Sequence, residues 1–127
     1  MMPSLLQSYY LLYGCSAGLS SILYILFPSG TVKYFGGTPC SSNQLWTQVV
    51  SAGDLLISYL CYVGYKSSNS ELQFVIIRGI SLYSLFHFGL FLYHHVRVQK
   101  HPHGGLPLYI GGLMCAIGAV FKWGNIL

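Results

Sequence analysis

Four long stretches of the chain are almost entirely apolar, and short polar segments separate them. The stretches are roughly Leu5–Phe27, Leu45–Tyr65, Leu72–Val98 and Leu106–Ile126. Each approaches or exceeds the ~20 residues that a helix needs to cross a hydrocarbon core of about 30 Å. The pattern therefore predicts an all-α fold, a four-transmembrane-helix antiparallel bundle, that forms a single transmembrane domain over residues 1–127.

Proline, glycine and polar residues mark the ends of these stretches. The run Phe27-Pro28-Ser29-Gly30 ends the first helix, and residues 28–44 are predicted to be the longest loop. Residues 66–71 form a short polar connection, which predicts that the second and third helices make an antiparallel hairpin. Because no basic segment precedes the first stretch, we expect it to be a retained helix and not a signal peptide.

The composition favours a membrane protein over a soluble domain. Hydrophobic residues make up 54% of the 127 residues and charged residues 6%, whereas a soluble domain usually carries about 25% charge. A soluble fold would leave large apolar patches in water, which monomeric proteins avoid. The six Lys and Arg residues form no basic run, which argues against nucleic-acid binding.

A stripe of polar residues lies along one face of the second predicted helix. Its members follow a spacing of three and four residues: Thr47, Ser51, Asp54, Ser58, Cys61 and Tyr65. Asp54 lies near the middle of that span, where a carboxylate is costly unless it is paired, protonated or functional. The stripe therefore predicts a polar partner for Asp54 inside the bundle.

The third helix offers two partners for Asp54, which are His87 and Arg78. These two residues are nine positions apart, which is about 180° around a helix, so they face opposite ways. His87 shares its face with Tyr83, and polar faces are expected to meet. We therefore predict an intramembrane polar seam of Asp54, His87, Tyr83 and Ser58, with an Asp54–Arg78 pair as the alternative.

Arg78 is then expected to extend toward the connection at residues 66–71. There it would meet either Glu71, seven residues earlier, or a lipid phosphate or partner chain. Lys122 and Trp123, near the end of the fourth stretch, are predicted to contact lipid or a partner in the same way.

Small residues predict where helices approach one another closely. Gly14 and Gly18 form a GxxxG pattern in the first stretch, and Gly112 and Ala116 repeat the spacing in the fourth. Close backbone approach drives helix association in lipid. These positions are predicted to pack either inside the bundle or against a partner chain.

The chain shows no sequence pattern of an enzyme. It has no nucleophile elbow, no Gly-rich phosphate loop and no pair of intramembrane carboxylates. His87 and His94 share one face of one helix, whereas a bis-His haem needs ligands on two facing helices. We expect no catalytic residues, no metal site and no cofactor, with a bound phospholipid such as cardiolipin as the one candidate ligand.

Short motifs along most of the chain resemble those of small four-helix DoxX-like membrane proteins. They are Phe27-Pro28, Phe35-Gly36-Gly37, Ala52-Gly53 and Arg78-Gly79. The resemblance implies a four-helix membrane fold. The related sterol-binding proteins, which are similar in layout, use intramembrane acids in their pocket, and Asp54 matches that role here.

These features predict a non-catalytic accessory subunit of a large organelle-membrane complex. The mitochondrial inner-membrane respiratory chain is the expected setting, with other membrane subunits and lipids as partners. The alternative is a small binding protein for a lipid, sterol or quinone that uses Asp54, Tyr83 and His87. A peripheral photosystem or antenna subunit is a third, weaker hypothesis.

Overall fold

All the regular secondary structure in the described part of the chain is α-helix. The computed structural model describes residues 4–98 and 106–123, and the side chains of the last helix are described for residues 109–119. The helices are α1 (Leu5–Leu26), α2 (Pro28–Tyr34), α3 (Ser41–Lys66), α4 (Ser70–Arg97) and α5 (Leu106–Trp123). Within these residues there is no strand, so the predicted all-α class is confirmed for them. A helix occupies each of the four apolar stretches.

Local capping explains where two of the long helices begin. Ser4 forms a capping box with Gln7: its Oγ accepts from the Gln7 N–H at 3.1 Å, and its own N–H donates to Gln7 Oε1 at 2.9 Å. Asn69 Oδ1 accepts from the N–H groups of Glu71 and Leu72 at the start of α4. Both caps satisfy backbone donors that the first turn of a helix leaves without partners.

The prediction of a loop over residues 28–44 is wrong at both ends, because residues 28–34 form α2 and α3 begins at Ser41. Pro28 takes the first helical position, where its fixed φ and missing N–H carry no cost. Gly36, with φ 81°, ends the helix in a Schellman motif: its N–H donates to the Lys33 carbonyl, and the Gly37 N–H donates to the Val32 carbonyl, both at 2.9 Å.

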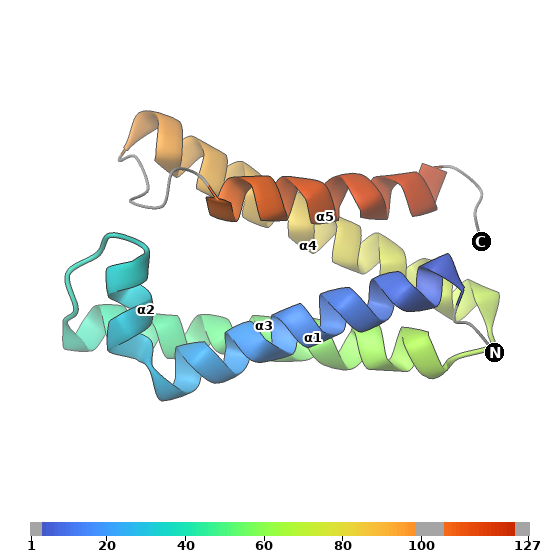
Figure 1. The fold of residues 1–127 in the computed structure, drawn as a ribbon, viewed down its shortest axis with the longest axis horizontal. Helices are drawn as coiled ribbons and strands as arrows, with labels where there is room; N and C mark the ends of the chain where they lie inside the picture. The colour runs from blue at the N-terminus through green and yellow to red at the C-terminus, as the bar shows by residue number, and fades with distance from the viewer. Residues whose placement is uncertain (1–3, 99–105, 124–127) are drawn as a thin grey trace. The chain divides into compact units, whose positions relative to one another are not determined.

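Phe27 is the one residue between α1 and α2. It is the C-cap of the first helix and the N-cap of the second, with φ −128° and ψ 51°. Its N–H donates to the Leu23 carbonyl, and its carbonyl accepts from the Thr31 N–H. The chain therefore changes direction at a single position, and α2 runs across the direction of α1 (Figure 1).

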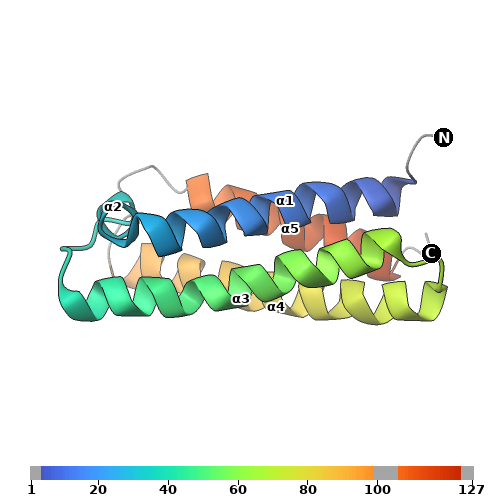
Figure 2. The same ribbon diagram turned by 90° about the horizontal axis from the view of Figure 1, so that it is seen from below.

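The chain divides into two compact units, residues 1–65 and residues 66–127. Unit 1 contains α1, α2 and nearly all of α3. Within it, α1 and α3 lie side by side and run antiparallel, as Figures 1 and 2 both show. Hydrogen bonds from α3 side chains to α1 carbonyls join these two helices directly.

Unit 2 is the antiparallel pair of α4 and α5, which pack along one another. Phe88 of α4 lies against two adjacent glycines of α5. A Cβ atom added at Gly112 would lie 3.0 Å from the Phe88 ring, and one at Gly111 would lie 4.0 Å from the Phe88 Cβ. One aromatic side chain therefore fills the space that the two glycines leave open.

Two of the described helices, α1 and α4, are long and apolar enough to cross a membrane. The described part of α5, over Tyr109–Ala119, is apolar but shorter. The long helix α3 is less apolar because it carries the polar stripe that includes Ser51, Asp54 and Ser58.

Candidate functional site

Small and polar side chains line the contact between α1 and α3, which we call the α1–α3 seam. It consists of Tyr10, Gly14, Gly18 and Ser21 from α1, and of Ser51, Asp54, Ser58, Cys61 and Gly64 from α3. Seven of these nine residues are buried, and Gly18 and Ser58 are half-buried. Four of the six residues of the predicted polar stripe therefore lie on the surface that α3 turns toward α1.

Two serine hydroxyls of the seam donate across it to backbone carbonyls. Ser58 Oγ donates to the Gly14 carbonyl at 2.8 Å, and Ser21 Oγ donates to the Ser51 carbonyl at 3.0 Å. A third bond, from Gln48 Nε2 to the Ile25 carbonyl at 3.2 Å, lies at the outer end of the contact. These bonds run in both directions between the helices and fix their register.

Glycines allow the backbones to approach closely in the seam. A Cβ atom at Gly14 would lie 2.8 Å from the Cys61 Cβ, and one at Gly18 would lie 2.9 Å from Ser58 Oγ. At Gly64 an added Cβ would lie 2.7 Å from the Tyr10 ring. The predicted GxxxG residues thus lie at a close contact inside unit 1, and Gly64 of α3 serves the same purpose from the opposite side.

Asp54 is the buried acid of the seam, with 8% of its surface exposed. It interacts electrostatically with Tyr24 of α1. The Tyr24 ring lies edge-on to Phe35 with 6.4 Å between centroids, and Phe35 in turn lies edge-on to Tyr34 at 5.1 Å. Tyr24, which begins this row of aromatic rings, is therefore the ring that lies close to the one carboxylate of residues 1–65.

Tyr83 and His87 were also predicted to join the intramembrane polar seam around Asp54. In the structure they contact one another in unit 2. Their rings lie 5.0 Å apart at 61°, and the His87 ring stacks on Phe91 at 5.5 Å and 13°. The three residues follow one another at intervals of four along α4, so they form a column on one face of the helix. The predicted pairing of Asp54 with His87 would join the two units and stays a prediction, as does its alternative with Arg78.

Arg78 lies on an exposed face of α4. Its guanidinium carbon lies 4.0 Å from the centroid of the Phe74 ring, one turn nearer the start of the helix. The side chain therefore extends toward residues 66–71, the direction predicted for it. Of the other residues predicted to contact lipid or a partner, the side chains of Lys122 and Trp123 lie outside the described residues.

The small residues predicted for packing in the fourth stretch differ in their surroundings. Gly112 lies against the Phe88 ring, whereas Ala116, one turn later, is exposed. Among the described residues of unit 2, the close contact is therefore at Gly112.

Unit 1 buries polar side chains in the seam and exposes many large apolar side chains. The α1 face turned away from the seam is exposed and apolar, and the exposed α3 face is of the same kind. These side chains are Leu11, Leu12, Leu19, Ile22, Leu26, Val49, Leu55 and Leu56. Monomeric water-soluble proteins rarely expose large contiguous apolar patches, so this apolar surface is a feature that the function has to explain.

Two residues of these sites had a detectable signal in the sequence that the prediction did not use. Tyr24 lies three residues after Ser21 and so continues the seam face of α1. Phe74 lies four residues before Arg78, which is the spacing for a helical cation–π contact. The contact of the polar stripe with α1 had a weaker signal, namely the run of Gly14, Gly18 and Ser21 on one face.

Among the described side chains, no group of three or more His, Cys, Asp or Glu residues is placed to hold a metal ion. Comparison of the chain with protein-family models, with curated proteins and with solved structures finds no match. The resemblance to DoxX-like proteins therefore stays a prediction, and the function is argued from the geometry alone.

Proposed function

We propose that the chain is a multi-pass membrane subunit with a structural role, held in a larger membrane complex by its exposed apolar helix faces. The observation that carries the proposal is the use of the polar groups in the α1–α3 seam. Ser21 and Ser58 donate to backbone carbonyls of the facing helix, so these hydroxyls join helices. A catalytic site would instead aim such groups at a substrate.

The apolar surface supports membrane insertion. α1 and α4 meet the length and composition that a spanning helix requires. For α3, burial of Ser51, Asp54 and Ser58 against α1 would hide its polar stripe from lipid, so that the helix inserts as a pair with α1. With α5 as the fourth span, the chain would form the four-span arrangement that the sequence predicts.

The number of spans is tested by labelling from one side of sealed vesicles. Cys40 lies between α2 and α3, and Ser68 lies between α3 and α4. In a variant that keeps Cys40 as its one cysteine, an impermeant maleimide should label the protein from one side. In a cysteine-free chain carrying Ser68→Cys, it should label from the other side. Labelling of both positions from the same side would contradict a spanning α3.

Membership of a complex is tested in gently solubilised membranes of the source cells. An epitope-tagged chain should stay with the membrane after alkaline extraction and should migrate on native gels well above its own mass of 14.1 kDa. We expect it to co-purify with subunits of a mitochondrial respiratory complex. Migration as a lone chain in several mild detergents would contradict the structural role.

A further inference from the structure

The first half of α4 has an exposed apolar face that carries one cation, Arg78. Arg78 is exposed, and its neighbours on that face are exposed as well: Val75, Gly79, Leu82, Leu85 and Phe86. A Cβ atom added at Gly79 would meet nothing within 4 Å, so the surface beside Arg78 is open. If this face meets lipid once the chain is inserted in a membrane, the charge needs an anionic partner.

The position of the guanidinium along α4 matches the level of lipid phosphates. The Arg78 backbone lies eight residues after Ser70, which is about 12 Å along the helix axis. Its head group lies over Phe74, one turn back toward the start of the helix, and so is only about 6 Å from that start. Arginines near span ends extend in this way to reach the interface.

A polar turn fixes that end of α4. Gln73 Nε2 donates to the Ser67 carbonyl at 2.8 Å, and the Asn69 N–H donates to Ser67 Oγ at 3.0 Å. With the Asn69 cap, these bonds make residues 67–73 a polar, internally bonded end to an otherwise apolar helix. Such an end suits the headgroup region of a bilayer.

We propose that Arg78 binds the phosphate of an anionic phospholipid on the exposed face of α4, an inference that rests on the membrane insertion in the proposed function. The planar guanidinium matches two phosphate oxygens at once, and the Phe74 ring holds it in place. The exposed apolar side chains toward the middle of the helix, such as Leu82 and Leu85, would contact the acyl chains. Glu71, exposed and two turns before Arg78, is the local competitor for the same charge.

The test measures lipid binding to the purified full chain in mild detergent by native mass spectrometry. The probes are phosphatidylglycerol, phosphatidylcholine and inorganic phosphate. The unaltered chain should retain phosphatidylglycerol in preference to phosphatidylcholine, and inorganic phosphate should not displace it because it lacks acyl chains. Arg78→Gln should lower the affinity for phosphatidylglycerol about fivefold. Arg78→Lys should lower it less, because Lys keeps the charge and loses the planar fork.

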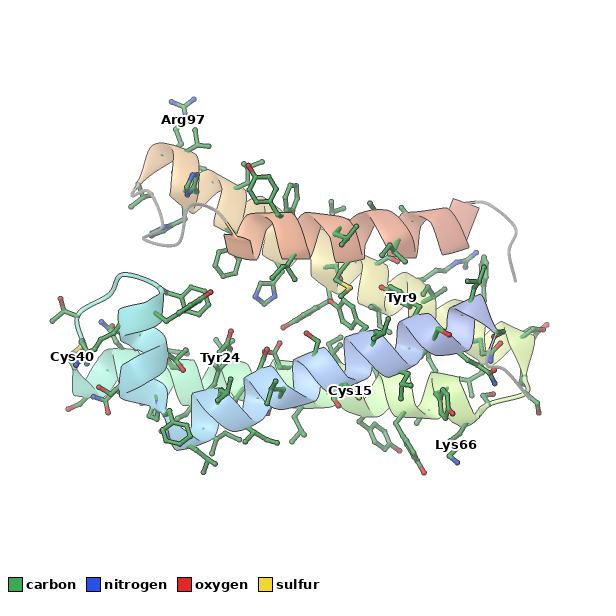
Figure 3. The ribbon with its side chains drawn as sticks, viewed as in Figure 1. Tyr9, Cys15, Tyr24, Cys40, Lys66 and Arg97 are labelled. Carbon is green, nitrogen blue, oxygen red and sulfur yellow. The ribbon has the colours of Figure 1, made fainter. Side chains whose placement is uncertain are left out.

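Two control variants distinguish a phosphate site at Arg78 from a general effect of positive charge and from an ion pair of Arg78 with Glu71. Lys66 lies at the end of α3 and points away from it (Figure 3), and Lys66→Gln should leave the preference unchanged. Glu71→Gln should keep or raise the affinity, because it removes the competing carboxylate. An equal loss in Lys66→Gln and Arg78→Gln, or no loss in Arg78→Gln, would overturn the proposal.

The outcome is separable from that of the proposed function. Circular dichroism of each variant should show unchanged helix content, since Arg78 is exposed. A chain that enters its complex but shows no preference for phosphatidylglycerol would refute the lipid site alone. A chain that binds phosphatidylglycerol through Arg78 but migrates alone would refute the structural role alone.

Discussion

The two units each contain a pair of antiparallel helices but hold it together by different means. In unit 1, glycines and serines bring α1 and α3 into backbone contact, with Gly14 against the Cys61 Cβ and hydroxyls bonded across the seam. In unit 2, the Phe88 ring fills the space beside Gly112. A contact built from backbone and Cβ atoms cannot adjust, whereas a ring can rotate away from an intruding group. We therefore expect unit 1 to tolerate substitution far less well than unit 2.

The largest expected effect concerns membrane insertion of α3 compared with α4. Asp54→Leu replaces a costly carboxylate by an apolar side chain and should improve insertion of isolated α3 by about 3 kcal/mol. Isolated α4 should insert without any substitution. Glycosylation mapping of each helix as a test segment in microsomes measures both. Asp54→Asn, which keeps a polar side chain, should improve insertion less; equal insertion of all three α3 segments would contradict this account of the helix.

Next comes overpacking of the α1–α3 seam. Gly14→Leu places a branched side chain where even a Cβ atom would lie 2.8 Å from the Cys61 Cβ, so α1 and α3 must separate. The free energy of unfolding in detergent should fall by about 2–3 kcal/mol. Gly79→Leu is the matched control, since an added Cβ meets nothing within 4 Å there. Equal stability of the two variants in a denaturant titration would contradict the claim that the α1–α3 contact at Gly14 is rigid.

Loss of one hydroxyl across the seam should cost less. Ser58→Ala removes the bond to the Gly14 carbonyl, and interhelical bonds of this kind average about 0.6 kcal/mol in membranes. Ser21→Ala should cost a similar amount, because it removes the bond to the Ser51 carbonyl. Ser16→Ala, on the exposed side of α1, is the control and should change the free energy of unfolding by less than either.

The smallest effect is expected in unit 2. In Gly112→Ala the new methyl group would lie 3.0 Å from an edge of the Phe88 ring, which can shift by rotation. The replacement of glycine in a helix also gains about 1 kcal/mol of helix propensity, which offsets the contact. The free energy of unfolding should therefore stay within about 0.5 kcal/mol of the starting value. A loss as large as that of Gly14→Leu would show that both units are equally rigid.

The hydrophobic pattern predicted the four long helices well, because a long apolar run is compatible with few structures other than a helix. The predicted start at Leu5 matches α1, and the third stretch, Leu72–Val98, lies within one or two residues of α4. The second stretch was predicted four residues too short at its start, because α3 begins with the polar run Ser41–Gln44. Polar residues at the end of a helix give no apolar periodicity to follow.

The α2 helix was missed although both of its boundary signals are in the sequence. The prediction uses Pro28 only to end the preceding helix, and it places Gly36-Gly37 inside a loop. Together, a proline at the first position and a glycine just past the end are typical of a short helix. A helix of seven residues is too short to show a clear hydrophobic periodicity, so the turn signals at its ends decided the prediction.

The face of the polar stripe was predictable, but its contact with α1 was not. Spacing alone placed Ser51, Asp54 and Ser58 on one side of α3, and they do lie there. The contact of these residues with α1 depends on which helices pair, and a periodicity contains no such information. The glycines of α1 were the available clue, since small residues invite a polar, close-packed neighbour.

The single-residue joint at Phe27 makes chain length the critical quantity at that corner. Surface connections usually accept an added or deleted residue at little cost. Here one residue is shared by two helices, so an insertion would turn α2 by about 100° about its axis. Val32, now buried at 8% exposure, would leave its place, and Phe35 would lose its contact with Tyr24. Related chains should therefore vary in residue type at this corner but keep the same spacing between the two helices.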